Sequence, residues 1–134
     1  YGGWCPNGGW AEDHPDPPGI LGLYPNLTPT PSAEPAERTA WNVRDSDRTL
    51  ILTGSGGLDA SPGTALTARL AGEAGRPYLV RDAFDPETAA AVAAWLANAP
   101  DRLVLNVAGP RESEMPGIYA TARRVLTAAL SGAD

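Results

Sequence analysis

The sequence has no lysine, a single cysteine and a single histidine, and the shortages of cysteine and histidine each exclude a class of protein. One cysteine, Cys5, cannot form an internal disulfide, so a disulfide-stabilised secreted scaffold is excluded and a reducing cytoplasm is the expected compartment. With one histidine, His14, neither a Ser-His-Asp nor a Cys-His catalytic arrangement is persuasive. Asp13, Asp16 and Cys5 lie near His14 in the sequence, but their spacing matches no zinc pattern, and we predict no metal site.

Long apolar runs and an excess of positive charge are also absent. No uninterrupted apolar run approaches the ~20 residues that cross a bilayer, and the first residues lack the blocks of a signal peptide. The formal net charge is -6, and all ten basic residues are arginine. Because nucleic acids and anionic membranes attract positive surfaces, neither is expected as a partner. Arginine does bind phosphate well, through a planar two-pronged fork.

The order of the predicted elements indicates an α/β fold. With 134 residues, 43 % of them apolar, residues 1–134 fit one domain with one core. Buried strands are predicted at 49–53, 78–80 and 103–107. Helices are predicted at about 32–45, at 62–74, and from 85 and 116 onward. Strands that alternate with amphipathic helices predict a Rossmann-like, doubly wound parallel sheet with helices on both faces.

Proline sets the character of the first quarter of the chain. Eight of the fourteen prolines lie before residue 36, so this region cannot be mostly helix or central sheet. Residues 1–4 are interpreted as a short strand, and residues 5–31 as a long loop. A loop of this length in a compact domain usually has a function, such as covering a site or forming a subunit contact.

Local signals predict where the helices begin and end. Ser32 is expected to cap the first helix. Asp59 or Ser61 caps the second, Pro62 occupies its first position and Gly75 ends it. Helical spacing predicts the buried stripe of this second helix: Leu66, Leu70 and Ala74.

The loop from Gly54 to Thr64 is the first candidate for binding. In parallel α/β folds ligands lie outside the carboxyl ends of the strands, and this loop follows such an end. Free N–H groups at a helix start favour an anion, and Gly63 would let that backbone approach a phosphate while the Thr64 hydroxyl adds a bond. Gly56 and Gly57 belong to the same loop. The glycine spacing matches neither GxGxxG nor a P-loop, and the alternative is a flexible connector.

The loop after the last predicted strand is the second candidate. Its candidate residues are Asn106, Gly109, Pro110, Arg111, Glu112 and Ser113. Arg111 and Ser113 are phosphate-binding types, and Asn106 at the strand end could reach a bound ring. The alternative makes Arg111 a surface cation that pairs with Glu112 or Glu114. Two such loops at one end of a sheet carry more weight than either alone.

A charged cluster at residues 44–48 precedes the first long strand. The simpler interpretation is a solvated turn with local ion pairs. Asp47 could alternatively meet a hydroxyl or ring nitrogen of a ligand.

Four segments of the sequence resemble one protein family. They are Gly-Gly-Trp-Cys-Pro at 2–6 with Ala-Glu-Asp at 11–13, the run ERTAWNVRDSD at 37–47, PGTALT at 62–67, and LNVAGPRES at 105–113 with PGIY at 116–119. Together they resemble the molybdenum-cofactor carrier family, whose superfamily also contains the LOG-type cytokinin-activating phosphoribohydrolases. The resemblance covers nearly the whole chain.

The resemblance implies a cytoplasmic homo-oligomer, a dimer or tetramer, that carries molybdenum cofactor (molybdopterin). Residues 63–64 and 106–113 would line the site for its phosphate and ring. LOG-type enzymes carry a catalytic Glu three residues after a Gly-Thr pair, but Thr67 stands at that position here, so binding is favoured over catalysis. The alternatives are a nucleotide-processing enzyme, in which Glu112 or Asp47 would have to supply the acid, and a sensor of a nucleotide-derived ligand. The family begins with a strand, a glycine-rich loop and a helix that have no counterpart before Tyr1, and we expect the full-length protein to carry them.

Overall fold

The computed structural model describes residues 4–5, 26–32, 34–97, 99 and 103–131. Its centre is a three-stranded parallel sheet with the strand order β4-β3-β5. The strands are β3 (Arg48–Thr53), β4 (Tyr78–Asp82) and β5 (Leu105–Ala108). The helices are α1 (Pro35–Arg44), α2 (Pro62–Glu73), α3 (Thr88–Leu96) and α4 (Ile118–Ser131), with a short 3-10 helix, η2 (Gly57–Ala60), between β3 and α2.

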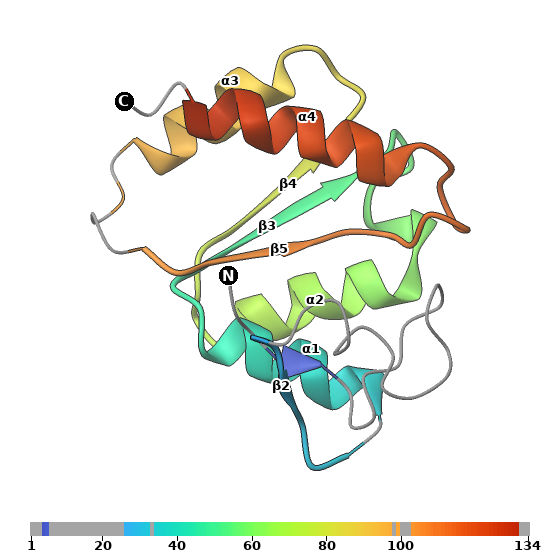
Figure 1. Ribbon diagram of the computed structural model, residues 1–134, viewed down its shortest axis with the longest axis vertical. Helices are drawn as coiled ribbons and strands as arrows, with labels where there is room; N and C mark the ends of the chain where they lie inside the picture. The colour runs from blue at the N-terminus through green and yellow to red at the C-terminus, as the bar shows by residue number, and fades with distance from the viewer. Residues whose placement is uncertain (1–3, 6–25, 33, 98, 100–102, 132–134) are drawn as a thin grey trace.

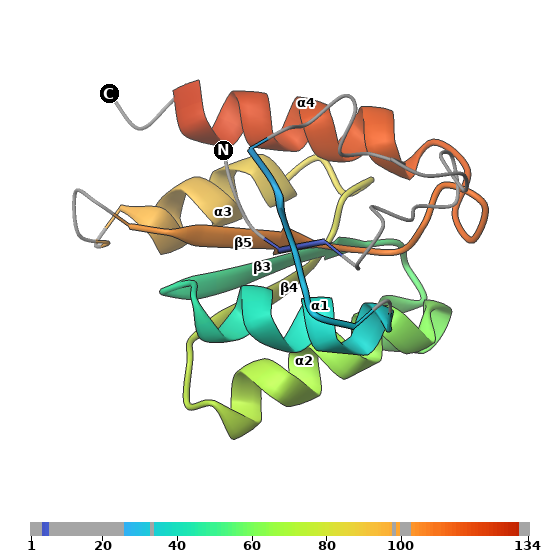
Figure 2. The same ribbon diagram turned by 60° about the horizontal axis from the view of Figure 1, so that its bottom comes forward.

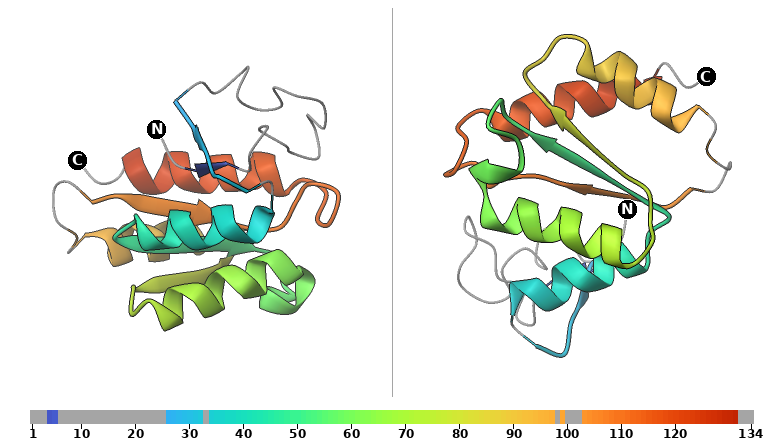
Figure 3. Two further views of the ribbon diagram at one scale, coloured as in Figure 1. Left: turned by 90° about the horizontal axis from the view of Figure 1, so that it is seen from below. Right: turned by 180° about the vertical axis from the view of Figure 1, so that it is seen from behind.

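The helices cover both faces of this sheet (Figure 1). Figure 2 shows α3 and α4 on one face and α1 and α2 on the other. The predicted Rossmann-like α/β fold, with parallel strands between two helical layers, is therefore confirmed. Two further short strands, β1 (Trp4–Cys5) and β2 (Thr28–Pro29), pair in parallel, and β1 contacts α1 (Figure 3). Most of the predicted strand at 1–4 and of the loop at 5–31 lies outside the described residues.

The central strand β3 explains why the sheet is stable. Leu50, Ile51 and Leu52 are at most 1 % exposed, because β3 has a strand on either side and helices on both faces. Leu50 and Leu52 belong to the core cluster under α3 and α4, where they meet Val92 and Ile118. Burying each such side chain contributes about 1.5–3 kcal/mol. A compact apolar run in the sequence predicts such a strand well, since no alternating polar face is needed.

Helix α2 begins and ends where its local signals predict. Ser61 is the N-cap, Pro62 is the first residue, and Gly75 follows the helix with a φ of +68°. The predicted buried stripe is wrong, however, since α2 buries Thr64, Thr67, Ala68 and Ala71. This face consists of small residues and lies against β3 and α1, so the larger leucines sit at its flanks, half-buried. Ala74 is exposed.

Three other predicted boundaries shift by a few residues. Ser32 does not cap α1, which has Glu34 at its N-cap position. Instead the Ser32 Oγ accepts a hydrogen bond from the Glu34 N–H at 3.0 Å. Helix α3 begins at Thr88 rather than 85, because the Asp85 carboxylate first forms a turn by accepting from Glu87 N–H at 2.9 Å. Strand β5 spans 105–108 rather than 103–107, as its register with β3 dictates. No helix among the described residues has the length and apolarity that a membrane span needs.

Candidate functional site

The two candidate loops meet at the carboxyl end of the sheet, at the right-hand side of Figure 1. Glu114, in the loop after β5, accepts two hydrogen bonds at Oε1, from the Ser61 hydroxyl at 3.1 Å and from the Arg111 N–H at 3.0 Å. The end of β3 also lies directly against this loop, because a Cβ on Gly54 would be 2.3 Å from the Met115 Sδ. A side-chain bridge therefore joins the loop before α2 to the loop before α4.

The segment after β3 is a folded turn rather than an unstructured connector. The Gly57 N–H donates to the Gly54 carbonyl at 3.0 Å, and the Thr53 hydroxyl donates to the Gly57 carbonyl at 3.1 Å. Gly57 has a φ of +61°, a conformation that favours glycine. Gly56 precedes η2 and is exposed. The turn delivers the chain to Ser61 at the start of α2.

The first turn of α2 is open to an approaching group. Gly63 is exposed, and a Cβ built on it would meet only the Ser61 Oγ, at an ordinary 3.9 Å. The Ser61 Oγ accepts from the Thr64 N–H at 3.5 Å, the limit of a hydrogen bond. Thr64 itself is 2 % exposed, and its hydroxyl has no hydrogen-bond partner among the described residues. Leaving a buried hydroxyl unpaired costs about 1–3 kcal/mol, so this group favours a partner.

The start of α4 is different, because the Glu112 carboxylate accepts hydrogen bonds from its backbone. The Glu112 side chain accepts hydrogen bonds from the Gly117 N–H and, at 3.0 Å, from the Tyr119 N–H. These two backbone bonds hold the pKa of Glu112 below its ordinary value of 4.5. A carboxylate at a helix N-terminus is also favoured by the helix dipole. Among the residues that the structure describes, no carboxylate bonds directly to the backbone at the start of α2, in contrast to the start of α4.

Glu112→Gln should lower the thermal stability of the protein at neutral pH. The depressed pKa of Glu112 means that its carboxylate contributes stability above 4.5, and that this contribution is lost as the pH falls through the lower folded pKa. The difference in melting temperature between the wild type and Glu112→Gln should therefore shrink on acidification and vanish below the folded pKa. Melting curves across this range test it. A difference that stays constant with pH would contradict the assignment.

The remaining candidate residues of the second loop are Gly109, Pro110, Arg111 and Ser113. Gly109 runs so close to β3 that a Cβ on it would lie 2.3 Å from the Leu52 carbonyl oxygen. Pro110, the next residue, is buried, whereas Arg111 and Ser113 are exposed.

Two predicted site residues lie away from this end of the sheet. Asp47 precedes β3, and its Oδ2 accepts from the Val104 N–H at 2.8 Å, which places it at the amino end of the strands. Asn106 stands in register with Thr49, and its Nδ2 lies 3.4 Å from the Thr49 Oγ1. Thr49 is four residues before Thr53, or about 13 Å at ~3.3 Å per residue. The structure does not bring either side chain to the bridge.

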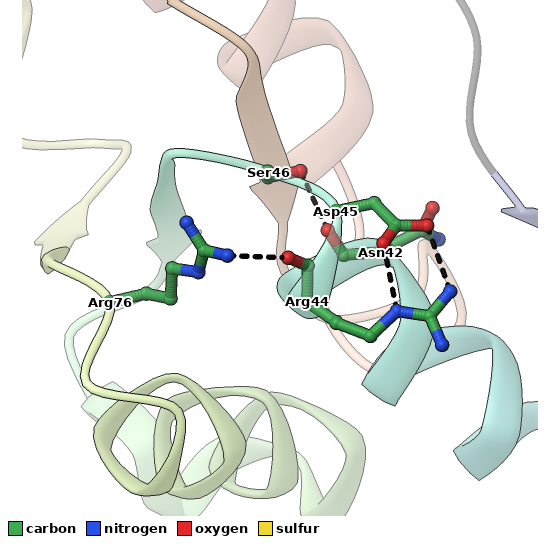
Figure 4. Close-up of polar contacts among 5 residues, drawn as sticks. All are labelled: Asn42, Arg44, Asp45, Ser46 and Arg76. Carbon is green, nitrogen blue, oxygen red and sulfur yellow. Dashed lines mark hydrogen bonds and ion pairs between the residues drawn. The ribbon is translucent and has the colours of Figure 1, made fainter.

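The charged cluster at 44–48 also lies at the amino end (Figure 4). Arg44 and Asp45 form an exposed ion pair at 2.8 Å, and Arg76 Nη2 donates to the Arg44 carbonyl at 3.0 Å. Ser46 donates to the Asn42 carbonyl at 2.6 Å. The simpler interpretation of a turn with local ion pairs is thus confirmed for Arg44 and Asp45. His14, Asp13 and Asp16 fall outside the described residues.

Sequence reasoning missed Glu114 and Ser61 as a bridging pair. Each residue was noticed, Ser61 as a helix cap and Glu114 as a partner for Arg111. They stand 53 residues apart, so only the assembled sheet brings them together.

The chain is similar to a protein family and to a solved structure. A family model described as "Circularly permutated YpsA SLOG family" matches residues 1–130. The chain belongs to the circularly permutated YpsA SLOG family. A crystal structure from Syntrophus aciditrophicus SB, named "Putative molybdenum carrier protein", is similar at 32 % identity and a TM-score of 0.81, over 97 % of this chain and 78 % of that one. The comparison with curated proteins gave no match.

These findings confirm the resemblance that the sequence motifs indicate, and they place the Ser61–Glu114 bridge within a SLOG-family fold. In this family member, Thr67 is 4 % exposed, and its hydroxyl donates to the Gly63 carbonyl at 3.0 Å. The position three residues after Thr64 is therefore a buried helical position without a carboxylate.

Proposed function

We propose that the protein binds a phosphorylated small molecule at the start of α2, and that this ligand is the phosphorylated pterin of molybdenum cofactor. The observation that carries the proposal is the Thr64 hydroxyl, 2 % exposed and without a partner among the described residues, in the first turn of a helix. A phosphate oxygen is an acceptor for that hydroxyl, and the Gly63 N–H and the dipole of the helix start favour its charge. The name of the Syntrophus protein supports the choice of cofactor.

Each residue near the helix start has a proposed task. Gly63 and Thr64 hold the phosphate, and Gly56 and Gly57 border it on the side of η2. Gly109, Pro110, Arg111 and Ser113 form the opposite rim, where the exposed Arg111 is the cation placed to meet an anion. We leave three predicted ligand residues out of the site: Asp47 and Asn106, because of their distance, and Glu112, because it is bonded to α4.

The same geometry favours a carrier over a nucleotide-processing enzyme. The two acids that could have replaced the missing catalytic Glu were Glu112 and Asp47. Glu112 accepts from the start of α4, and Asp47 accepts from Val104 at the other end of the sheet. The cytoplasmic location and the homo-oligomeric state that the resemblance implies belong to the same proposal.

Thr64→Val should separate binding from stability. Valine has the shape of threonine without the hydroxyl, so the melting temperature should stay equal or rise once the unpaired group is removed. Binding of inorganic phosphate and of molybdenum cofactor should weaken about tenfold, the equivalent of one hydrogen bond to a charged group. Titration calorimetry of both ligands is the measurement.

Thr49→Val is the matched control for this experiment. Thr49 is also buried, at 0 % exposure, but it lies at the amino end of β3. The Thr49→Val substitution should leave the affinities for inorganic phosphate and for molybdenum cofactor unchanged. Equal affinities in wild type and Thr64→Val, with ligand bound in each, would count against the phosphate site. No binding of either ligand by the wild type would remove the proposed function.

A further inference from the structure

Glu114 holds an unusual position for a site that favours anions. One of its carboxylate oxygens, Oε1, forms the bridge to Ser61 and to the Arg111 N–H. Ser61 Oγ in turn stands 3.5 Å from Thr64 N and 3.1 Å from Glu114 Oε1. The carboxylate is therefore one hydroxyl group away from the Thr64 N–H, at the helix start where the phosphate is proposed to bind.

The second oxygen of Glu114 has acceptor capacity left. A carboxylate offers about four lone-pair sites, and the two bonds at Oε1 use half of them. No interaction of Oε2 is seen among the described residues, and the Glu114 side chain is exposed. An ionised carboxylate can only accept hydrogen bonds, so Oε2 suits a hydroxyl or amino donor and repels further negative charge.

We propose that Glu114 determines which phosphate compounds the site takes: it accepts a hydrogen bond at Oε2 from a hydroxyl or amino group next to the ligand's phosphate, and it disfavours anions without such a donor. This inference rests on the proposed phosphate site at α2. It adds a chemical class to that function, namely phosphate esters with a donor group close to the phosphate. A bound anion at Thr64 lies within roughly 8 Å of the Glu114 charge, about one Debye length, so screening leaves part of the repulsion intact.

Glu114→Gln tests the inference because it is nearly isosteric. The amide oxygen can keep the bridge to Ser61 and Arg111, and the amide NH₂ then replaces Oε2. The change removes the negative charge and turns an acceptor into a donor. Two probes report on it: sulfate, an anion without donors, and guanosine monophosphate, whose ribose hydroxyls are donors on the same sugar that carries the phosphate.

The two affinities should move in opposite directions. In Glu114→Gln we expect sulfate to bind about threefold tighter or more, and guanosine monophosphate about threefold weaker or more, measured by titration at constant ionic strength. Glu114→Asp keeps the charge but shortens the reach, so it should weaken guanosine monophosphate without improving sulfate. Glu73→Gln is the matched control for charge, since Glu73 is an exposed acid at the far end of α2, and it should change neither.

The failure of this inference differs from failure of the phosphate site. If Gly63→Ala weakens binding of both probes at least tenfold but Glu114→Gln shifts both in the same direction, or neither, Glu114 does not select ligands and the phosphate site stands. If neither probe binds to the wild type, the phosphate site and the role of Glu114 are both overturned. Melting curves of each Glu114 variant show whether the bridge is kept.

Discussion

Gly63→Ala should weaken phosphate binding at least tenfold while leaving the fold intact or slightly more stable. Gly63 lies in the first turn of α2 with ordinary helical φ, and an added Cβ would meet only Ser61 Oγ at 3.9 Å. Alanine in a helix is more stable than glycine by up to about 1 kcal/mol. The same methyl group would occupy the space through which a phosphate reaches the Gly63 N–H at the helix start, so the affinity should fall at least tenfold, or about 1.4 kcal/mol.

Gly72→Ala supplies the control within the same helix. Gly72 lies near the other end of α2, where an added Cβ would meet only Tyr78, at 3.9 Å. It should raise stability in the same way and leave phosphate binding unchanged. Calorimetric titration together with melting curves for both variants gives the comparison. If Gly63→Ala binds phosphate as well as the wild type does, the ligand does not approach the start of α2.

Gly109→Ala should have the opposite result, a large loss of stability. A Cβ at this position would lie 2.3 Å from the Leu52 carbonyl oxygen, well inside van der Waals contact. Leu52 is 1 % exposed in the central strand, and β5 pairs with β3 up to the residue before Gly109. Neither backbone can move without disturbing this pairing, so we expect a loss of about 3 kcal/mol in the free energy of unfolding.

Gly57→Ala shows whether contact or backbone conformation is responsible. A Cβ on Gly57 would meet nothing within 4 Å, but its φ is +61°. Its cost should be that of a left-handed residue alone, about 1–2 kcal/mol. Chemical denaturation of both variants measures the difference. A Gly109→Ala protein as stable as Gly57→Ala would show that β5 can shift away from β3.

The sequence was a good guide where structure depends on near neighbours. Ser61 and Pro62 begin α2 because a cap and a proline act within one helical turn. The strand at 48–53 follows from its own apolar run. The buried face of α2 could not be predicted in the same way, because the choice among its apolar positions depends on how closely α1 and β3 approach.

In the candidate site, too, some residues follow from local signals and others depend on the assembled sheet. Gly63 and Thr64 follow from a local rule about helix starts, and the structure has both in the first turn of α2, with Gly63 exposed and Thr64 buried. Asp47 precedes β3 in the sequence, which already places it at the amino end of that strand. The position of Asn106 along the sheet depends on the register of β5 with β3, which its own loop does not indicate. The role of Glu114 depends on a partner 53 residues away, so no pattern within one loop could indicate it.

The hydrogen bond between Asp47 and Val104 bears on the order in which the protein folds. It joins two residues that are 57 positions apart in the sequence, with β3, α2, β4 and α3 between them. Closing a long loop costs more entropy than closing a short one, so β3 should pair first with β4, its nearer neighbour in sequence, and β5 should join late. Ser61 belongs to the early part and Glu114 to the late part. A chain emerging from the ribosome would therefore complete the proposed site only when β5 and α4 join the sheet.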